Sequence, residues 1–213
     1  MPVWKRLALG AIAGALCLFA LIAANIAAGD PLVALDAAAA RWVLAHRTPA
    51  LTLLMLGVTH AHAPFALCVY ASIAGSYCYR RRLYRWVTAL ALAVPVGLAL
   101  NFALKLVFRR ARPVPGDAAM TLASYSFPSG HAAGATLFWG VLAAYAMTRT
   151  ASHRARAAVT AAWLGLVALV AFSRVYLGVH YVSDVLAACA WSLAWLAAAL
   201  LVATRVRPSN GHA

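Results

Sequence analysis

Long apolar runs of about 20 residues recur along the chain and constrain its fold more than any other feature. We place six of them, at residues 7–28, 51–77, 86–108, 132–147, 157–173 and 182–203. A helix of this length crosses a hydrocarbon core of roughly 30 Å. Each run should be helical, because a backbone in lipid must satisfy its own hydrogen bonds. The sequence therefore predicts an all-α, polytopic six-helix transmembrane bundle.

The composition supports lipid as the main solvent of this chain. Hydrophobic residues make up 65% of the sequence and charged residues only 10%, a balance that a water-soluble domain of this size does not need. No low-complexity tract or internal repeat interrupts the pattern. We therefore treat residues 1–213 as a single membrane domain.

The first apolar run has an alternative interpretation as a cleaved signal peptide, because it follows Lys5 and Arg6 and ends in the small residues Ala27 and Ala28. A signal peptide has an apolar core of about 7 to 15 residues, and this run is longer. We favour a membrane span.

Basic residues predict the orientation of the helices. The 11 Lys and Arg residues that fall on one side, if the helices alternate, are Lys5, Arg6, Arg80, Arg81, Arg82, Arg85, Arg149, Arg154, Arg156, Arg205 and Arg207. The positive-inside rule makes this side the cytoplasm, so both termini should be cytoplasmic. The net charge of +14 follows largely from this topology, and with no soluble basic domain we expect no nucleic-acid partner.

The first outer loop, residues 31–48, reads as a helix too short and too charged to span the membrane. The apolar residues that could lie in the interface are Leu32, Leu35, Trp42, Val43 and Leu44. The alternative is a plain connecting loop. With this interfacial segment, residues 1–85 would supply two N-terminal spans.

The scarcity of acidic residues argues against a metal centre. The chain has four aspartates and no glutamate, so a carboxylate-held Mg²⁺ or two-metal site is hard to build. Its four cysteines lack metal-ligand spacing. We expect no metal and no cofactor.

Two clusters of polar residues on the predicted outer side could bind an anion. Lys105 and Arg112 would share a face if the third helix continued to Arg112, before Pro113. The alternative is a basic helix end that snorkels to the headgroups. Ser129, Gly130 and His131 stand where loop becomes helix, so backbone N–H groups and the helix dipole could bind phosphate, although Ser129 could equally be a helix cap.

A third cluster contains Arg174, His180 and Asp184. On a helix, the i, i+4 spacing of His180 and Asp184 would place both side chains within hydrogen-bond reach. The carboxylate would fix one ring nitrogen and leave the other free to attack a substrate. A structural ion pair is the alternative. All three clusters reach one membrane face in the predicted topology, and together they suit a phosphate better than a neutral ligand.

The three clusters together resemble the signature of the PAP2 (type 2 phosphatidic acid phosphatase) superfamily. The matching segments are Lys105-x₆-Arg112-Pro113, then Pro128-Ser129-Gly130-His131, then Ser173-Arg174-x₅-His180-x₃-Asp184. The resemblance implies a catalytic core at residues 86–204. It also implies that Lys105, Arg112, Ser129, Gly130 and Arg174 hold the phosphoryl group. His180 would be the nucleophile oriented by Asp184, and His131 would be the general acid and base.

The expected activity is metal-independent hydrolysis of a lipid phosphate through a phosphohistidine, in a bacterial inner membrane with the site facing the periplasm. Undecaprenyl diphosphate, phosphatidylglycerol phosphate and phosphatidic acid are substrates of relatives of this size. A lipid phosphotransferase, or a non-catalytic lipid-phosphate binder or transporter, is the alternative. Arg109 and Arg110 match no motif position, and we expect them to attract anionic headgroups or simply to be solvated.

Overall fold

A computed structural model describes residues 3–29, 31–113 and 124–206, and within them the chain is helical with no strand. The helices are α1 (Val3–Ala28), α2 (Pro31–Ala45), α3 (Pro49–Ala61), α4 (Pro64–Arg80), α5 (Tyr84–Ala91), the π-helical turn η1 (Leu92–Val96), α6 (Gly97–Phe108), α7 (Gly130–Thr148), α8 (His153–Tyr176) and α9 (Val182–Ala203). The predicted all-α class is confirmed for this part of the chain. Residues 114–123, in the predicted outer loop, lie outside the described residues.

Four helical segments of the described chain are long and apolar enough to cross a membrane: Ala8–Ala28, Tyr84–Phe108, His153–Tyr176 and Val182–Ala203. The bent pair α3 and α4 makes a fifth if it is counted as one span. The central helix α7 is not among them. It contacts α4, α5, α6, α8 and α9, so it packs against protein on most sides and has little need of a lipid-facing apolar surface.

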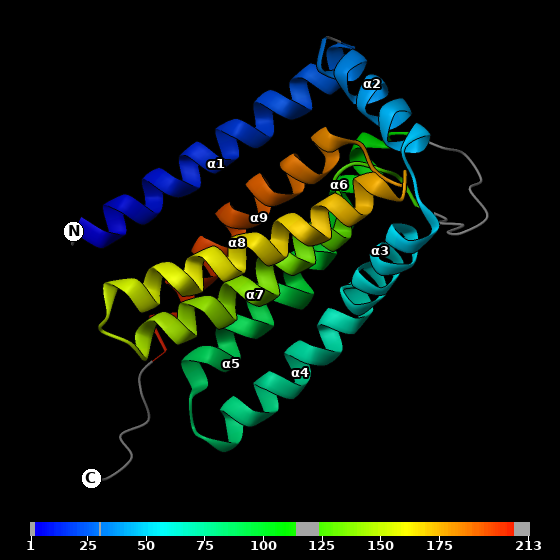
Figure 1. Ribbon diagram of the computed structural model, residues 1–213. Coiled ribbons are helices and arrows are strands. Elements are labelled where there is room, and N and C mark those ends of the chain that lie inside the picture. The colour runs from blue at the N-terminus through cyan, green and yellow to red at the C-terminus, as the bar shows by residue number, and fades with distance from the viewer. Residues whose placement is uncertain (1–2, 30, 114–123, 207–213) are drawn as a thin grey trace.

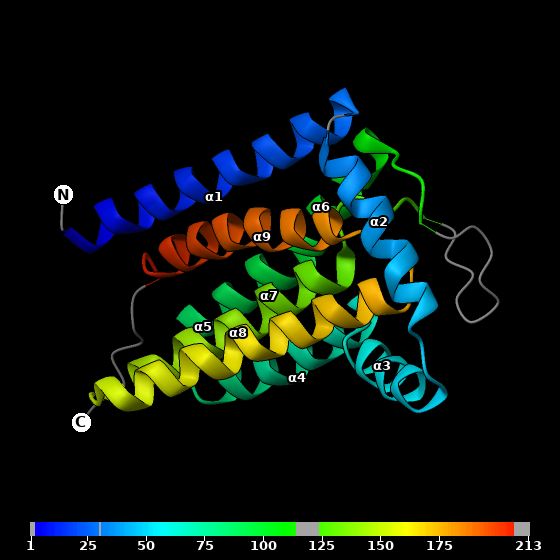
Figure 2. The ribbon, with the colours of Figure 1, turned by 45° about the horizontal axis from the view of Figure 1, so that its top comes forward.

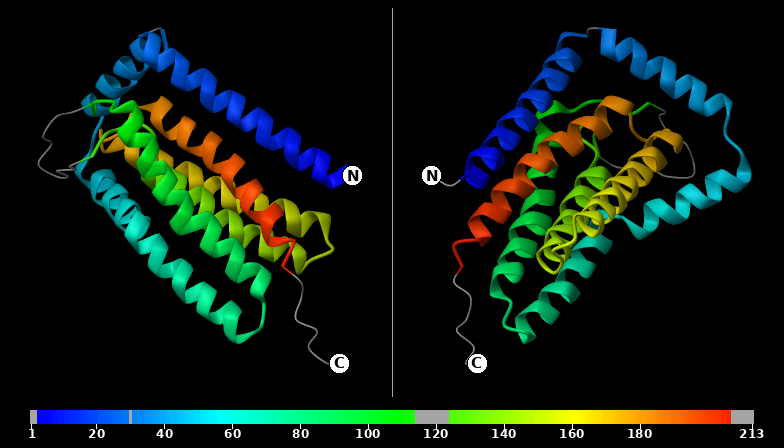
Figure 3. Two further views of the ribbon diagram at one scale, coloured as in Figure 1. Left: turned by 180° about the vertical axis from the view of Figure 1, so that it is seen from behind. Right: turned by 60° about the vertical axis from the view of Figure 1, so that its left-hand side comes forward.

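The helices α4 to α9 run alongside one another, whereas α2 lies across one end of the bundle (Figure 1 and Figure 2). There α2 contacts both α8 and α9. The two termini lie at the opposite end (Figure 3). The first helix, α1, packs mainly along α9. The end of the bundle beneath α2 is where α6 and α8 finish and α7 and α9 begin.

Close packing fixes α7 in the centre of the bundle. Leu67, Val94, Leu137 and Val141 are all buried in one cluster between α4, η1 and α7. Gly134 makes the approach of α4 possible, because a Cβ atom there would lie 2.6 Å from Cδ1 of Leu67. Small residues at helix contacts allow this kind of close approach in membrane bundles.

The second predicted span, 51–77, is wrong as one continuous helix. The structure breaks it after Ala61, and the two parts meet at an angle of 48°. Pro64 begins the second part, and proline has no N–H to donate and its ring clashes with the preceding turn. The turn at this break brings Thr59 of α3 towards α8, where its hydroxyl accepts a hydrogen bond from Arg174.

The predicted short helix at 31–48 is present as α2, but its apolar side chains divide between two environments. Leu35 and Trp42 are 65% and 64% exposed. Val43 is instead buried against Met55 and Tyr176, so its predicted place at the lipid interface is wrong. The helix is therefore fixed to the protein on one side.

Replacing Leu67 with alanine should lower the free energy of unfolding by about 2–5 kcal/mol, because Leu67 is fully buried and the change leaves a cavity. Thermal unfolding in detergent would measure the loss. Leu53→Ala is the matched control, since Leu53 is 72% exposed and should change stability little. Equal losses in the two variants would contradict the central packing described above.

Candidate active site

The predicted site residues come together at the end of the bundle that α2 covers. Lys105 lies in the last turn of α6, His131 in the first turn of α7, Arg174 in the last turn of α8 and Asp184 in the first turn of α9. The other four, Arg112, Ser129, Gly130 and His180, lie in adjoining loops or at a helix start. His131 lies within electrostatic range of three cationic side chains, Lys105, Arg112 and Arg174. The structure thus gathers four helix ends around one small volume.

His180 and Asp184 form the centre of this arrangement. Nδ1 of His180 lies 3.4 Å from Oδ2 of Asp184, and both side chains are buried. The same Oδ2 accepts hydrogen bonds from the Ser126 hydroxyl and from the Tyr181 N–H. The carboxylate is therefore held by several donors, as a buried charge requires.

The helical register predicted for this pair is wrong in one detail. Helix α9 begins at Val182, so His180 precedes the helix and Asp184 occupies its third position. The Asp184 side chain bonds back to the N–H of Tyr181 at the helix start, which is half of a capping box. The contact with His180 then arises from the turn before α9, and not from two positions on one helical face.

The imidazole of His180 is neutral over the physiological pH range. Its pKa is lowered to about 3, chiefly by burial and also by the charges of Lys105 and Arg174, while Asp184 opposes the shift. Nε2, the nitrogen that faces away from Asp184, lies 3.5 Å from the guanidinium of Arg112. A neutral ring with its second nitrogen directed towards cations can act as a nucleophile on an anionic phosphorus centre.

Backbone carbonyl groups hold two of the three predicted cations. Lys105 Nζ donates to the carbonyl oxygens of Tyr125 and Ser126. Arg112 donates to the carbonyl oxygen of Val179 at 2.6 Å and to that of Ser124 at 2.9 Å. A carbonyl dipole orients a cation without neutralising it. Both side chains therefore keep their charge for a ligand.

The predicted continuation of the third helix to Arg112 is wrong. Helix α6 ends at Phe108, and Arg109 adopts a left-handed conformation with φ of 46°. The chain then leaves the helix axis and turns back over the site, where the side chains of Arg110 and Arg112 form hydrogen bonds around the start of α9. Lys105 and Arg112 meet because of this turn, and not because they share a helical face.

The Ser129 hydroxyl makes no hydrogen bond among the described residues. Ser129 is the residue before α7, but its side chain makes no capping hydrogen bond. It is fully buried, and its oxygen has no hydrogen-bond partner among the described residues. Its backbone is fixed, since its N–H donates to the Asp184 carbonyl oxygen at 3.1 Å. A buried hydroxyl without a partner is costly. The predicted cap is not observed, and phosphate binding by Ser129 stays a prediction.

A buried amide holds the loop before α7 in place. Asn101 of α6 donates to the carbonyl oxygen of Pro128 at 3.3 Å, and its own oxygen accepts from the Trp191 indole at 3.0 Å. This bridge from α6 to α9 fixes the loop that carries Ser129 and Gly130. Asn101 was not among the predicted residues, because one amide within an apolar run carries no motif.

Two further residues, Asp36 and Arg110, belong to the site and were missed as such. Arg110 donates to Asp36 Oδ2 at 2.8 Å and to Asp184 Oδ1 at 2.6 Å. It therefore contacts carboxylates and not headgroups, so the expectation of a headgroup-binding or solvated Arg110 is wrong. Burial alone would lower the pKa of Arg110, but the two carboxylates raise it above its usual value. Acidic residues are rare in this chain, and this rarity is the sequence feature that could have identified Asp36 as a site residue.

The charges of the site leave a positive excess. Four cations, at Lys105, Arg110, Arg112 and Arg174, face two carboxylates, at Asp36 and Asp184. Among the described residues of the site, cationic side chains therefore outnumber carboxylates by two. This excess matches a phosphate group, which carries close to two negative charges at neutral pH.

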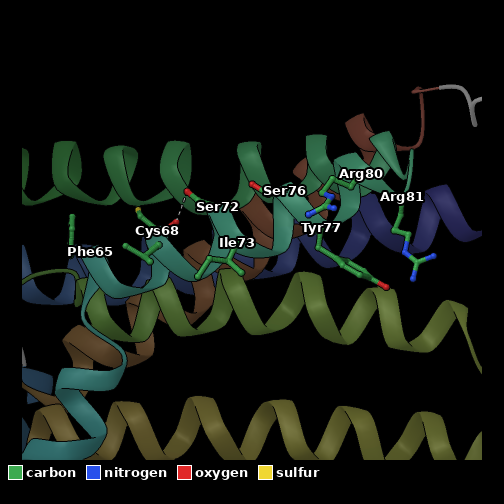
Figure 4. Close-up of a pocket in the computed structure, with 9 residues that line it drawn as sticks. Phe65, Cys68, Ser72, Ile73, Ser76, Tyr77, Arg80 and Arg81 are labelled. Atoms are coloured by element: carbon green, nitrogen blue, oxygen red, sulfur yellow. Dashed lines mark hydrogen bonds between the residues drawn. The ribbon is translucent and has the colours of Figure 1, made fainter.

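A separate hollow of about 1060 Å³ lies along α4 and contains none of the predicted site residues (Figure 4). Its lining comes from α4 and the residue that follows it, and ranges from Phe65 to Arg81. A shallow face on one helix, without polar groups converging from other elements, is not built like a catalytic site.

Comparisons with known proteins agree with the geometry. Residues 86–208 match the PAP2 superfamily. Phosphatidylglycerophosphatase B of Bacillus subtilis (strain 168) is 35% identical over 179 residues, which cover 80% of this chain and 84% of that protein. The crystal structure of a transmembrane PAP2-type phosphatidylglycerolphosphate phosphatase from Bacillus subtilis superposes with a TM-score of 0.74 at 26% identity, over 93% of this chain and 98% of that one.

Replacing Ser129 with alanine should weaken the binding of inorganic phosphate by about tenfold or more, the loss expected for a hydrogen bond to a charged group. It should not lower the melting temperature of the ligand-free protein, because the buried hydroxyl has no partner among the described residues to lose. Phosphate-dependent thermal shifts would measure both quantities. Ser72→Ala on the exposed face of α4 is the control, and unchanged phosphate binding in the Ser129 variant would contradict this role.

Proposed function

Because this chain belongs to the PAP2 superfamily of phosphatases, we propose that it hydrolyses the phosphate monoester of phosphatidylglycerophosphate in the membrane. The observation that carries the proposal is the buried pair of His180 and Asp184, which lies near the cations Lys105, Arg112 and Arg174. The substrate follows from the names of the relatives, both of which are phosphatases of this lipid phosphate. The chain is an integral membrane protein and a PAP2-type lipid phosphatase.

In the first step, Nε2 of His180 attacks the phosphorus atom and the bond from phosphorus to the glycerol oxygen breaks. The leaving alkoxide takes a proton from His131 and departs as phosphatidylglycerol. Asp184 stabilises the positive ring that forms on His180. Lys105, Arg112 and Arg174, with the Ser129 hydroxyl and the Gly130 amide, stabilise the charge of the transferring phosphoryl group.

In the second step, water attacks the phosphohistidine. His131, now neutral, accepts a proton from the water, and the bond between phosphorus and Nε2 breaks to release phosphate and restore His180. The position of His131 in the first turn of α7, beside the phosphoryl-binding loop, supports this role. A lipid acceptor in place of water would make the protein a phosphotransferase.

The proposed reaction needs no metal. Side-chain cations supply the charge that Mg²⁺ supplies in many phosphoryl-transfer enzymes. Within the part of the chain that the structure describes, no three His, Cys, Asp or Glu side chains come together as a metal site.

For the membrane topology we propose six spans, with α7 and the pair α3–α4 included, and both termini in the cytoplasm. The site would then face the periplasm of a bacterial inner membrane, and α2 would lie at that interface with Trp42 exposed to headgroups. The common end of the two termini in Figure 3 supports an even number of crossings. Residues 86–204 would be the catalytic core, with residues 1–85 adding two spans and α2.

Purified protein should release phosphate from phosphatidylglycerophosphate in the presence of EDTA, and should do so faster than from undecaprenyl diphosphate. His180→Ala and His131→Ala should lower kcat by a factor on the order of 10³ or more, because each removes a group that takes part in bond making or breaking. His60→Ala is the matched control, since His60 is an exposed histidine on α3.

Complete loss of activity with EDTA would contradict the metal-free mechanism. Labelled phosphate that accumulates on lipid while little free phosphate forms would indicate the phosphotransferase instead. Preference for undecaprenyl diphosphate would overturn the substrate but not the reaction.

The topology can be tested with single cysteines in a background lacking the four native ones. Cysteine at position 41, in Arg41→Cys on α2, should react in intact cells with a membrane-impermeant maleimide. Cysteine at position 81, in Arg81→Cys after α4, should react only once the membrane is opened, because position 41 precedes the pair α3–α4 and position 81 follows it. Labelling of both in intact cells would contradict the proposed orientation.

A further inference from the structure

Helix α2 inserts a buried carboxylate into the end of the bundle. Asp36 is 2% exposed, although its helix carries exposed side chains at Leu35 and Trp42. Burial of a charged side chain is costly unless it is paired and hydrogen-bonded. Its position on a short helix outside the membrane-crossing helices shows that this carboxylate is not needed for spanning the bilayer.

The partners of Asp36 all belong to the start of α9 or to Arg110. Oδ1 accepts the backbone N–H of Ser183 at 3.0 Å, and Oδ2 accepts the Ser183 hydroxyl and the Arg110 guanidinium. The first of these bonds satisfies an N–H in the opening turn of α9, which has no partner within its own helix. Asp36 therefore caps α9 from another helix, at the residue next to the catalytic carboxylate.

Arg110 connects the two carboxylates. One end of its guanidinium contacts Asp36 and the other contacts Asp184 Oδ1 at 2.6 Å. The central carbon of this guanidinium lies over the ring of Tyr181, 4.2 Å from its centre. Three contacts in different directions leave a planar, rigid group little freedom. Arg110 consequently fixes the oxygen of Asp184 that His180 does not use.

Resting on the function proposed above, we infer that Asp36 and Arg110 act as one positioning unit for the catalytic pair, with Asp36 holding Arg110 so that it steadies Asp184 behind His180. Neither residue touches the phosphoryl group. With Asp36 present, the Arg110 guanidinium pairs with two carboxylates, those of Asp36 and Asp184. Without it, the guanidinium would have Asp184 as its sole anion, or would turn towards the phosphate pocket that Lys105 and Arg112 line.

Two consequences follow from this geometry. First, both carboxylate oxygens of Asp184 are engaged, Oδ1 by Arg110 and Oδ2 by Ser126 and His180. Rotation of the carboxylate would therefore misplace the imidazole, and small displacements at a reacting centre cost large factors in rate. Second, docking of α2 and activity are linked, because the catalytic pair reaches its geometry only when Asp36 is in place.

The test compares Asp36→Asn, Arg110→Lys, the double variant and the control Arg41→Gln, using phosphatidylglycerophosphate and a water-soluble aryl phosphate. Asp36→Asn should lower kcat by about tenfold with little change in KM. Arg110→Lys should do the same, because a lysine keeps the charge but has no fork to join two carboxylates. The double variant should lose no more than the worse single variant, as residues that act as a unit do.

The control Arg41→Gln removes an exposed charge from the same helix and should match the wild type. Melting temperatures and gel filtration in detergent identify any variant that does not fold. If Asp36→Asn does not fold, Arg110→Lys, which conserves the charge, decides the question. In that variant too, kcat should fall while KM changes little.

Three results would overturn the inference: wild-type kcat in the single variants, a rise in KM with kcat unchanged, or losses that multiply in the double variant. Failure of the wild type on phosphatidylglycerophosphate, with cleavage of the aryl phosphate, would instead refute the proposed lipid substrate. The aryl phosphate then still reports on the positioning unit.

Discussion

The buried carboxylate of Asp184 is the constraint on which the rest of this site depends. A charge in that position would be prohibitively costly if it lacked partners. The protein supplies four partners from three places in the chain: Arg110 after α6, the Ser126 hydroxyl before α7, and the His180 ring with the Tyr181 N–H before α9. The hydrogen bonds that the Asp184 carboxylate requires thus determine where the loops after α6 and α8 must lie.

The same constraint separates the cations into two functional groups. Arg110 is used by carboxylates, whereas Lys105 and Arg112 are oriented by carbonyl oxygens and keep their charge. The Asp184 carboxylate makes no hydrogen bond to Lys105 or Arg112, and it pairs with Arg110 instead. A site with this division can hold a neutral imidazole and a dianionic phosphate side by side, which is what attack on a phosphate ester requires.

Sequence alone predicted the features that depend on long-range composition and on complete motifs. Apolar length predicted helices close to α1, α8 and α9, because a run of this kind has no other stable form in lipid. It did not predict the break at Pro64, and although the predicted run ended at Phe108, the shared face of Lys105 and Arg112 required a helix that continued past the observed end of α6. Both depend on local backbone geometry, and the second follows from a left-handed turn at Arg109 that its neighbours in sequence do not signal.

The site was predictable only as far as its residues stand in motifs. Asp36 joins Ser183 across 147 positions of the chain, and no spacing rule connects residues so far apart. The free-energy cost of a carboxylate near a membrane could have identified it. In a chain with only four acidic residues, each carboxylate is expected where it has strong partners. The cationic neighbours of such an acid are then the next residues to seek, and here Arg110, interpreted from the sequence as a surface charge, joins Asp36 of α2 to Asp184.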